Sequence, residues 1–218
     1  MEKEEILIEN TIAFVKQTLK NAEGGHDWFH IERVYKNSCL IAETEECDLV
    51  VVKLGALLHD IADSKFHNGN ESVGPTIARE FLEKENVPEE TILHCIKIIE
   101  NISFKGGNSK VNFHSKELDI VQDADRLDAI GAIGIARAFN YGGFKNRKLY
   151  DPKILPNLNF TKEEYKASTA PSINHFYEKL LLLKDKMNTK TAKKLAEKRH
   201  LVMEQFLKQF YNEWNGLL

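Results

Sequence analysis

Residues 49–63 read LVVVKLGALLHDIAD, an apolar segment that ends abruptly in ionisable side chains. Asp48 precedes this segment, and aspartate commonly caps helix N-termini, so we expect a helix over residues 48–60. His59 and Asp60 follow directly after Gly-Ala-Leu-Leu. Burying these two groups in a dry core without partners would cost free energy. The segment therefore predicts a polar site at the end of an apolar helix.

A metal ion would supply the missing partner, because imidazole nitrogen and carboxylate oxygen are common metal ligands. Neighbouring residues on a helix point about 100° apart, so His59 and Asp60 can reach one ion only near a helix end. The loop-type sequence that follows Asp63 indicates such an end. A buried His–Asp hydrogen bond without a metal explains the pair equally well, and this segment alone leaves both interpretations open.

Two other segments place ionisable side chains in helical sequence. Residues 26–34 read HDWFHIERV, so His26 and His30 are four residues apart and share one helical face. Residues 121–128 read VQDADRLD, in which three carboxylates interrupt apolar sequence. The other histidines are isolated, and an isolated histidine is more often a surface or hydrogen-bonded core residue than a ligand. These are His67, His94, His114, His175 and His200.

The chain as a whole predicts an all-α protein with one domain over residues 1–218. Only five prolines and twelve glycines interrupt long stretches with apolar residues at helical spacing. Besides 48–60, helices are expected over 3–22, 26–43, 75–86, 88–102, 115–140, 161–186 and 190–214. The buried face of the last of these is expected to carry Leu195, Val202, Phe206 and Phe210. The helix over 115–140 is expected to bend near Gly131 or Gly134, and residues 141–160 are expected to be irregular.

Composition argues against several classes of protein. Charged residues make up 29% and apolar residues 42%, which is typical of globular rather than disordered chains. The net charge of -3 gives no reason to expect a nucleic-acid or membrane-surface partner. Apolar runs are too short for a transmembrane helix, and the acidic N-terminus lacks a secretory signal. Because the three cysteines show no CxxC spacing, we expect reduced thiols and a cytoplasmic location.

Three motifs in order, HxxRV, ALLHDIAD and QDADRLDA, resemble those of the HD-domain metal-dependent phosphohydrolases. The closer resemblance is to small bacterial HD proteins that read GHDWxHxxRV, LLHDIxDxKF, ISFKG and DADRLDAIGA, some of which are nucleotide pyrophosphohydrolases. It spans nearly the whole chain, including SINHFYEKL at residues 172–180. The resemblance implies a single HD-type helical bundle with its metal-site core at about 20–140 and a loop and packed C-terminal helices over 141–218.

The resemblance also implies a ligand set. His30 rather than His26 matches the family position, because it precedes Arg33 by three residues. Asp125 rather than Asp123 matches, because the family places the ligand immediately before Arg-Leu. The implied metal ligands are His30, His59, Asp60 and Asp125.

One divalent ion is expected. HD proteins with two metals often carry adjacent histidines between the HD pair and the last aspartate, and residues 98–103, IIENIS, have none. Mixed nitrogen and oxygen ligands make Mn²⁺ the first candidate, with Mg²⁺, Fe²⁺, Co²⁺ and Ni²⁺ as alternatives. Two neutral imidazoles and two carboxylates would leave the ion Lewis acidic.

The resemblance finally implies hydrolysis of phosphate bonds in nucleotides. Asp63 is the candidate catalytic residue, since some HD nucleotidases carry an acidic side chain there, although a loop-capping role fits it equally. The candidate substrate-binding residues are Lys65, Lys105, His26 and Lys179. The leading reaction converts a nucleoside triphosphate to monophosphate and pyrophosphate. A nucleoside 5'-monophosphate phosphatase and a low-turnover nucleotide or metal sensor are the alternatives, and a homodimer is left open.

Overall fold

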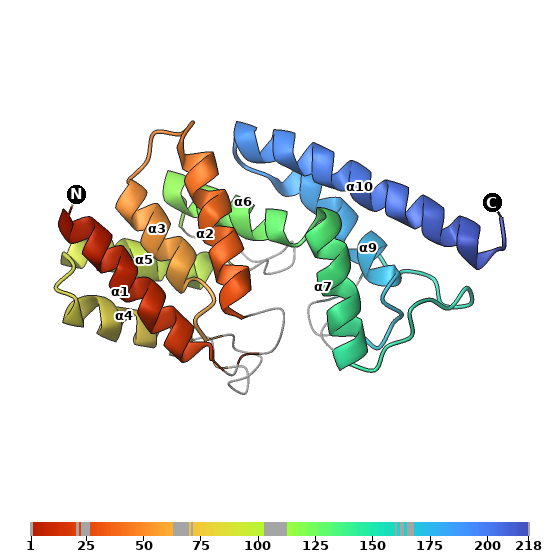
Figure 1. The fold of residues 1–218 in the computed structure, drawn as a ribbon, viewed down its shortest axis with the longest axis horizontal. Helices are drawn as coiled ribbons and strands as arrows, with labels where there is room; N and C mark the ends of the chain where they lie inside the picture. Colours follow the sequence, from red (N-terminus) through yellow and green to blue (C-terminus); the bar gives the residue numbers. More distant parts are fainter. Residues whose placement is uncertain are drawn as a thin grey trace. The chain divides into compact units, whose positions relative to one another are not determined.

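The computed structural model describes residues 2–20, 22, 27–62, 70, 72–102, 113–159, 161, 164 and 168–217. Over these residues the chain is helical and contains no β-strand, which confirms the all-α prediction (Figure 1). The helices are α1 (Glu2–Thr18), α2 (Trp28–Ala42), α3 (Leu49–Leu58), α4 (Val73–Lys84), α5 (Glu89–Asn101), α6 (Lys116–Asp128), α7 (Gly131–Phe144), α9 (Asn174–Glu178), the 3₁₀ helix η2 (Leu180–Lys186) and α10 (Lys190–Trp214). In the described part of the chain, no helix combines the length and apolar character needed to cross a membrane.

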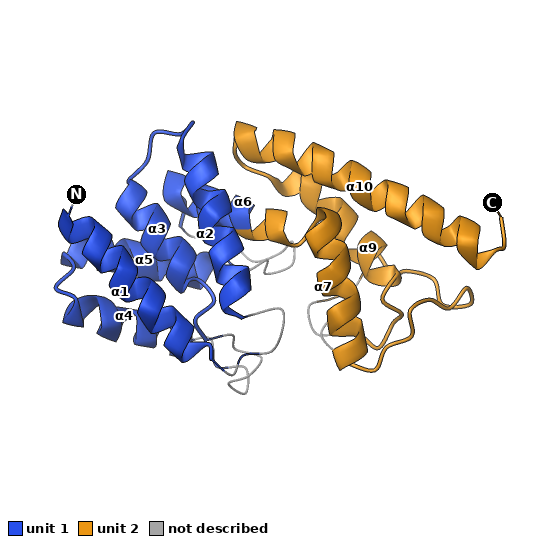
Figure 2. Cartoon of the chain, viewed as in Figure 1, with its two compact units in different colours: residues 1–124 blue, residues 125–218 orange. Residues whose placement is uncertain are grey.

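Two compact units make up the chain, residues 1–124 and residues 125–218 (Figure 2). The division falls inside α6, between Ala124 and Asp125. The first unit therefore holds α1 to α5 and most of α6, and the second holds the end of α6 and the helices that follow. That the whole chain acts as one domain stays a prediction.

Helix α3 is the centre of the first unit. Apart from Lys53 it is apolar, with Leu54, Leu57 and Leu58 fully buried, and α1, α2 and α5 pack around it. Asp48 caps its N-terminus by accepting hydrogen bonds from the backbone N–H groups of Val50 (2.9 Å) and Val51 (3.1 Å), as predicted. This packing fixes the far end of α3, where the His-Asp pair lies.

The predicted helix over 115–140 is two helices rather than one bent helix. Helix α6 ends at Asp128 and α7 begins at Gly131. Between them Ile130 is extended (φ -125°, ψ 165°), and Gly131 has φ +76°, a conformation that glycine adopts without strain. The break therefore lies at one of the two glycines where a bend was expected.

The prediction of one continuous helix over 161–186 is wrong among the described residues of that range. Residues 168–173 are not helical, and only the short α9 and the 3₁₀ helix η2 follow. Pro171 explains the difference, because it lacks an N–H and disfavours helical geometry in the residue before it. The backbone N–H groups of Ser172 and Ile173 instead donate to the carbonyls of Lys148 (2.9 Å) and Leu149 (3.0 Å).

Helix α10 agrees with the predicted range and packs against α7. Its buried face consists of Ala192, Ala196, Met203 and Leu207. Val202, expected on that face, is 41% exposed. Phe206 meets Phe139 of α7 and stacks on Phe176 of α9, at 5.7 Å between ring centroids in each pair. Aromatic packing thus joins α7, α9 and α10 in the second unit.

Candidate metal centre

Three of the predicted ligands meet in the first unit. His30 lies in the first turn of α2, and Asp27 caps that helix by accepting from the His30 backbone N–H at 3.0 Å. His59 follows the last residue of α3, and Asp60 comes directly after it. One ligand atom from each of His30, His59 and Asp60 lies within 4.8 Å of the other two. The end of α3 therefore lets two neighbouring residues face the same point, as expected.

The side-chain contacts of His59 orient its ring, with Nδ1 toward Ala56 and Nε2 toward His30. Nδ1 of His59 lies 2.8 Å from the carbonyl oxygen of Ala56. A carbonyl oxygen only accepts, so Nδ1 carries a proton and Nε2 is the ring nitrogen that can act as a ligand. That Nε2 lies 3.3 Å from Nε2 of His30, which in turn lies 3.9 Å from Oδ2 of Asp60. A backbone carbonyl that orients a histidine in this way is a common support for metal ligands.

The spacing fits a metal ion. Two nitrogens each about 2.1 Å from one ion lie roughly 3.0–3.4 Å apart at a right or tetrahedral angle, and the two imidazoles here match that separation at 3.3 Å. His30 is 1% and His59 7% exposed, whereas the Asp60 side chain is 18% exposed. Buried imidazole and carboxylate groups that converge on one point can therefore hold a divalent cation, with Asp60 on the side nearer to solvent.

The fourth predicted ligand belongs to the second unit. Asp125 is the first residue of that unit and lies half-buried on α6. Its two carboxylate neighbours on the helix, Asp123 and Asp128, are 0% and 1% exposed. The role of Asp125 as a ligand stays a prediction.

The structure describes only one of the other predicted site residues. His26, Asp63, Lys65 and Lys105 lie outside the described residues. Lys179 follows the last residue of α9, and its backbone N–H donates to the carbonyl of His175 at 3.0 Å. It is half-buried in the second unit.

Two positively charged side chains lie near His175. Burial, together with the nearby charges of Lys179 and Arg147, lowers the pKa of His175 from 6.5 to about 3. The ring is therefore neutral at physiological pH, and the cations beside it are Lys179 and Arg147. Arg147 is held in place by a 2.6 Å hydrogen bond from its guanidinium to the carbonyl of Ser168.

The lowered pKa of His175 predicts a pH dependence of stability. The folded pKa of His175 lies below the ordinary value of 6.5, so the unfolded chain binds the proton first as the pH falls. The free energy of unfolding should therefore decrease between about pH 6.5 and pH 3, with a contribution from this group of up to roughly 1.4 kcal/mol per pH unit. Urea unfolding at pH 8, 6, 5 and 4 should show a shallower loss for His175→Gln than for the wild type. Parallel curves for the two proteins would contradict this role.

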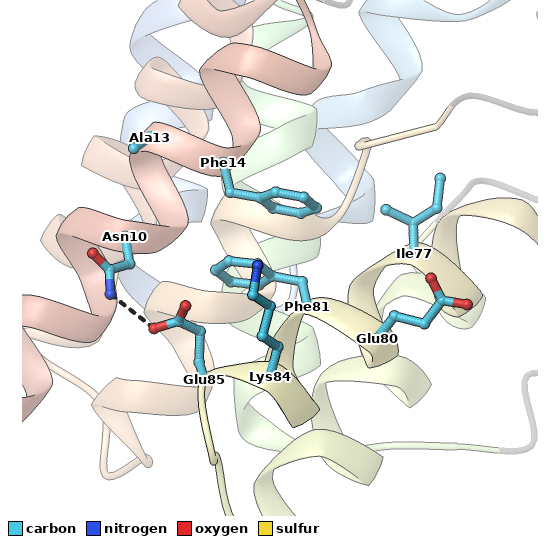
Figure 3. A pocket seen from close by; sticks show the side chains of 8 residues that line it. All are labelled: Asn10, Ala13, Phe14, Ile77, Glu80, Phe81, Lys84 and Glu85. Carbon is cyan, nitrogen blue, oxygen red and sulfur yellow. Dashed lines mark hydrogen bonds between the residues drawn. The ribbon is translucent and has the colours of Figure 1, made fainter.

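A surface pocket on the first unit lies between α1 and α4 (Figure 3). Phe14 and Phe81 stack there at 4.1 Å between ring centroids, and Asn10 donates a 2.8 Å hydrogen bond to Glu85. The predicted site residues do not line this pocket. The stacked rings and the Asn10–Glu85 bond join α1 to α4, which is a packing role.

Sequence reasoning did not single out the arginines that contact the end of α6. Arg137 of α7 binds the Asp128 side chain, and Arg199 of α10 binds the Leu127 carbonyl. No short motif marks either arginine. The only indication was Asp128 itself, a carboxylate in buried helical sequence, which requires a charged or hydrogen-bonding partner.

Comparison with known proteins places these observations in context. The family model described as HD domain matches residues 28–130, a range that contains all four predicted ligands. The uncharacterized protein YpgQ of Bacillus subtilis (strain 168) is 39% identical over 207 residues, covering 94% of this chain and 92% of YpgQ.

Solved structures are also similar to this chain over nearly its whole length. The crystal structure of an HD-superfamily hydrolase from Bacillus thuringiensis is 46% identical, covers 97% of this chain and 98% of its own, and superposes with a TM-score of 0.78. The structure of Bacillus subtilis YpgQ in complex with ADP is 34% identical, covers 97% of this chain and 96% of its own, and has a TM-score of 0.77.

Proposed function

Because this chain belongs to the HD-domain family of hydrolases, we propose that it is a metal-dependent phosphohydrolase that converts nucleoside triphosphates to monophosphates and pyrophosphate. The observation that carries the proposal is the convergence of His30, His59 and Asp60 on one point. The ADP complex of YpgQ supports a nucleotide as the ligand.

The proposed ligand set is His30, His59, Asp60 and Asp125, holding one divalent ion, with Mn²⁺ as the first candidate. A bound ion of this kind supplies Lewis acidity toward a phosphate oxygen and makes water more acidic. His59 is held in the ligating tautomer by the Ala56 carbonyl, and Asp60 presents its carboxylate on the more exposed side. Burial of the two imidazoles keeps competing water away from them.

Hydrolysis also requires a group that accepts the proton of the attacking water and cations that bind the phosphates. Asp63 is proposed to accept the proton of the attacking water, since it lies three residues after Asp60. Lys65 and Lys105 are proposed to bind the phosphates that leave, with Lys179 and His26 as further contacts. Several cations suit a polyphosphate tail better than a single phosphate, which favours pyrophosphate as the leaving group.

Product analysis tests the proposal. The protein with Mn²⁺ is incubated with a panel of nucleoside triphosphates and monophosphates, and the products are followed by phosphorus NMR. Pyrophosphate and a nucleoside monophosphate are expected as the first products from triphosphates. Orthophosphate released from monophosphates would instead indicate a phosphomonoesterase, and tripolyphosphate would indicate cleavage at the sugar oxygen. Binding without products would indicate a sensor.

A further inference from the structure

Two arginines and a glycine shape the corner between α6 and α7, namely Arg137, Arg199 and Gly131. The last carbonyls of a helix have no hydrogen-bond donors within the helix. At the end of α6, arginine side chains supply two such donors. Arg199 of α10 donates to the Leu127 carbonyl at 2.5 Å, and Arg137 of α7 donates to the Asp128 carbonyl at 3.3 Å. All of these residues lie in the second unit. The end of α6 is thus fastened by side chains from two other helices.

Arg137 makes a second contact that is stronger. The same guanidinium nitrogen lies 2.6 Å from Oδ2 of Asp128, whose side chain is 1% exposed. A buried carboxylate is costly without a charged partner, and removing one member of a buried pair typically destabilises a protein strongly. Arg137 therefore holds both the backbone and the side chain of the last residue of α6.

Arg199 leaves no room for a side chain at Gly131. A Cβ at that glycine would lie 2.9 Å from Cβ of Arg199, and the positive φ of Gly131 also disfavours other residues. Burial lowers the pKa of the Arg199 guanidinium, while the nearby charge of Asp128 raises it. Asp128 thus interacts with two arginines, from α7 and α10.

Asp125 lies one helical turn before Asp128, and residues three apart on a helix share a face. The final turn of a helix frays unless its groups are bound. We propose that Arg137 is a positioning residue, which by pairing with Asp128 fixes the last turn of α6 and so holds the Asp125 carboxylate in its ligating direction. This inference rests on the proposed function, because it takes Asp125 as a metal ligand.

Metal titration tests the role of Arg137. Mn²⁺ binding to the full chain is measured by calorimetry, well below the unfolding temperature, for the wild type, Arg137→Met, Arg137→Lys and Asp125→Ala. Loss of a group that supports a ligand typically weakens metal binding about 10- to 100-fold. We expect a loss in this range for Arg137→Met, a partial recovery for Arg137→Lys, and a larger loss for Asp125→Ala.

A control separates positioning from a general loss of stability. Leu207→Ala removes a buried apolar side chain of α10 and lowers stability by leaving a cavity. It should bind Mn²⁺ as the wild type does. Equal weakening in Leu207→Ala and Arg137→Met would overturn the positioning role.

Unchanged binding in Arg137→Met, with binding lost in Asp125→Ala, would overturn this inference alone. Unchanged binding in Asp125→Ala would overturn the proposed ligand set, and the positioning role with it. If Arg137→Met does not fold, wild-type affinity in Asp128→Asn, which removes the charge of the same pair, would overturn the proposal.

Discussion

Replacing His59 with alanine is expected to abolish tight binding of divalent metal and, with it, nucleotide hydrolysis. The imidazole Nε2 of His59 lies 3.3 Å from that of His30, so the substitution removes half of the nitrogen ligands of the proposed site. The loss of affinity should exceed the roughly 10- to 100-fold that follows removal of a supporting residue. Asp125→Ala is expected to have the same consequence.

The measurement is metal content by elemental analysis after equilibration with Mn²⁺, together with helical content by circular dichroism. Helical content should change little, because His59 comes after the last residue of α3 and contributes one side-chain bond to it. His94→Ala is the matched control, since His94 is a histidine of the same unit that bonds to Ser115 rather than to the cluster. Equal metal content in the wild type and His59→Ala would show that the ligand set is wrong.

The sequence predicted the local geometry of the site well, because helix ends have strong local signals. Asp48 caps α3 as expected, and the apolar run that follows ends where His59 and Asp60 begin. That His30 joins them could not follow from spacing alone, because it requires the packing of α2 against α3. It came instead from the resemblance to the HD family, which the comparison with known proteins confirms.

The sequence was less informative where distant contacts override local preference. The segment over 161–186 has helical periodicity, yet Pro171 and the backbone bonds of Ser172 and Ile173 to residues 148–149 keep residues 168–173 out of a helix. The buried face of α10 was misjudged for a similar reason. Small side chains at Ala192 and Ala196 face the interior, and apolarity alone does not identify them.

Replacing Gly134 with alanine is expected to destabilise the protein. Gly134 lies in the first turn of α7, where the backbone of Ala129 leaves no space for a side chain. A Cβ at Gly134 would lie 2.2 Å from the carbonyl oxygen of Ala129 and 2.5 Å from its carbonyl carbon. These are backbone atoms of the α6–α7 corner, which Arg137 and Arg199 hold in place, so they cannot move aside cheaply. Overpacking of this kind costs about 1–3 kcal/mol, and the rigid backbone neighbour favours the upper end.

Gly143→Ala provides the matched control in the same helix. No atom lies within 4 Å of a Cβ at Gly143, so the added methyl group meets open space. Alanine there should stabilise α7 by roughly 0.5–1 kcal/mol, since glycine inside a helix loses more backbone entropy on folding. Thermal melts should therefore move in opposite directions for the two variants, downward for Gly134→Ala and slightly upward for Gly143→Ala. A melt of Gly134→Ala at or above that of the wild type would mean that the corner can widen, and a corner that widens freely could not hold the Asp125 turn in one direction.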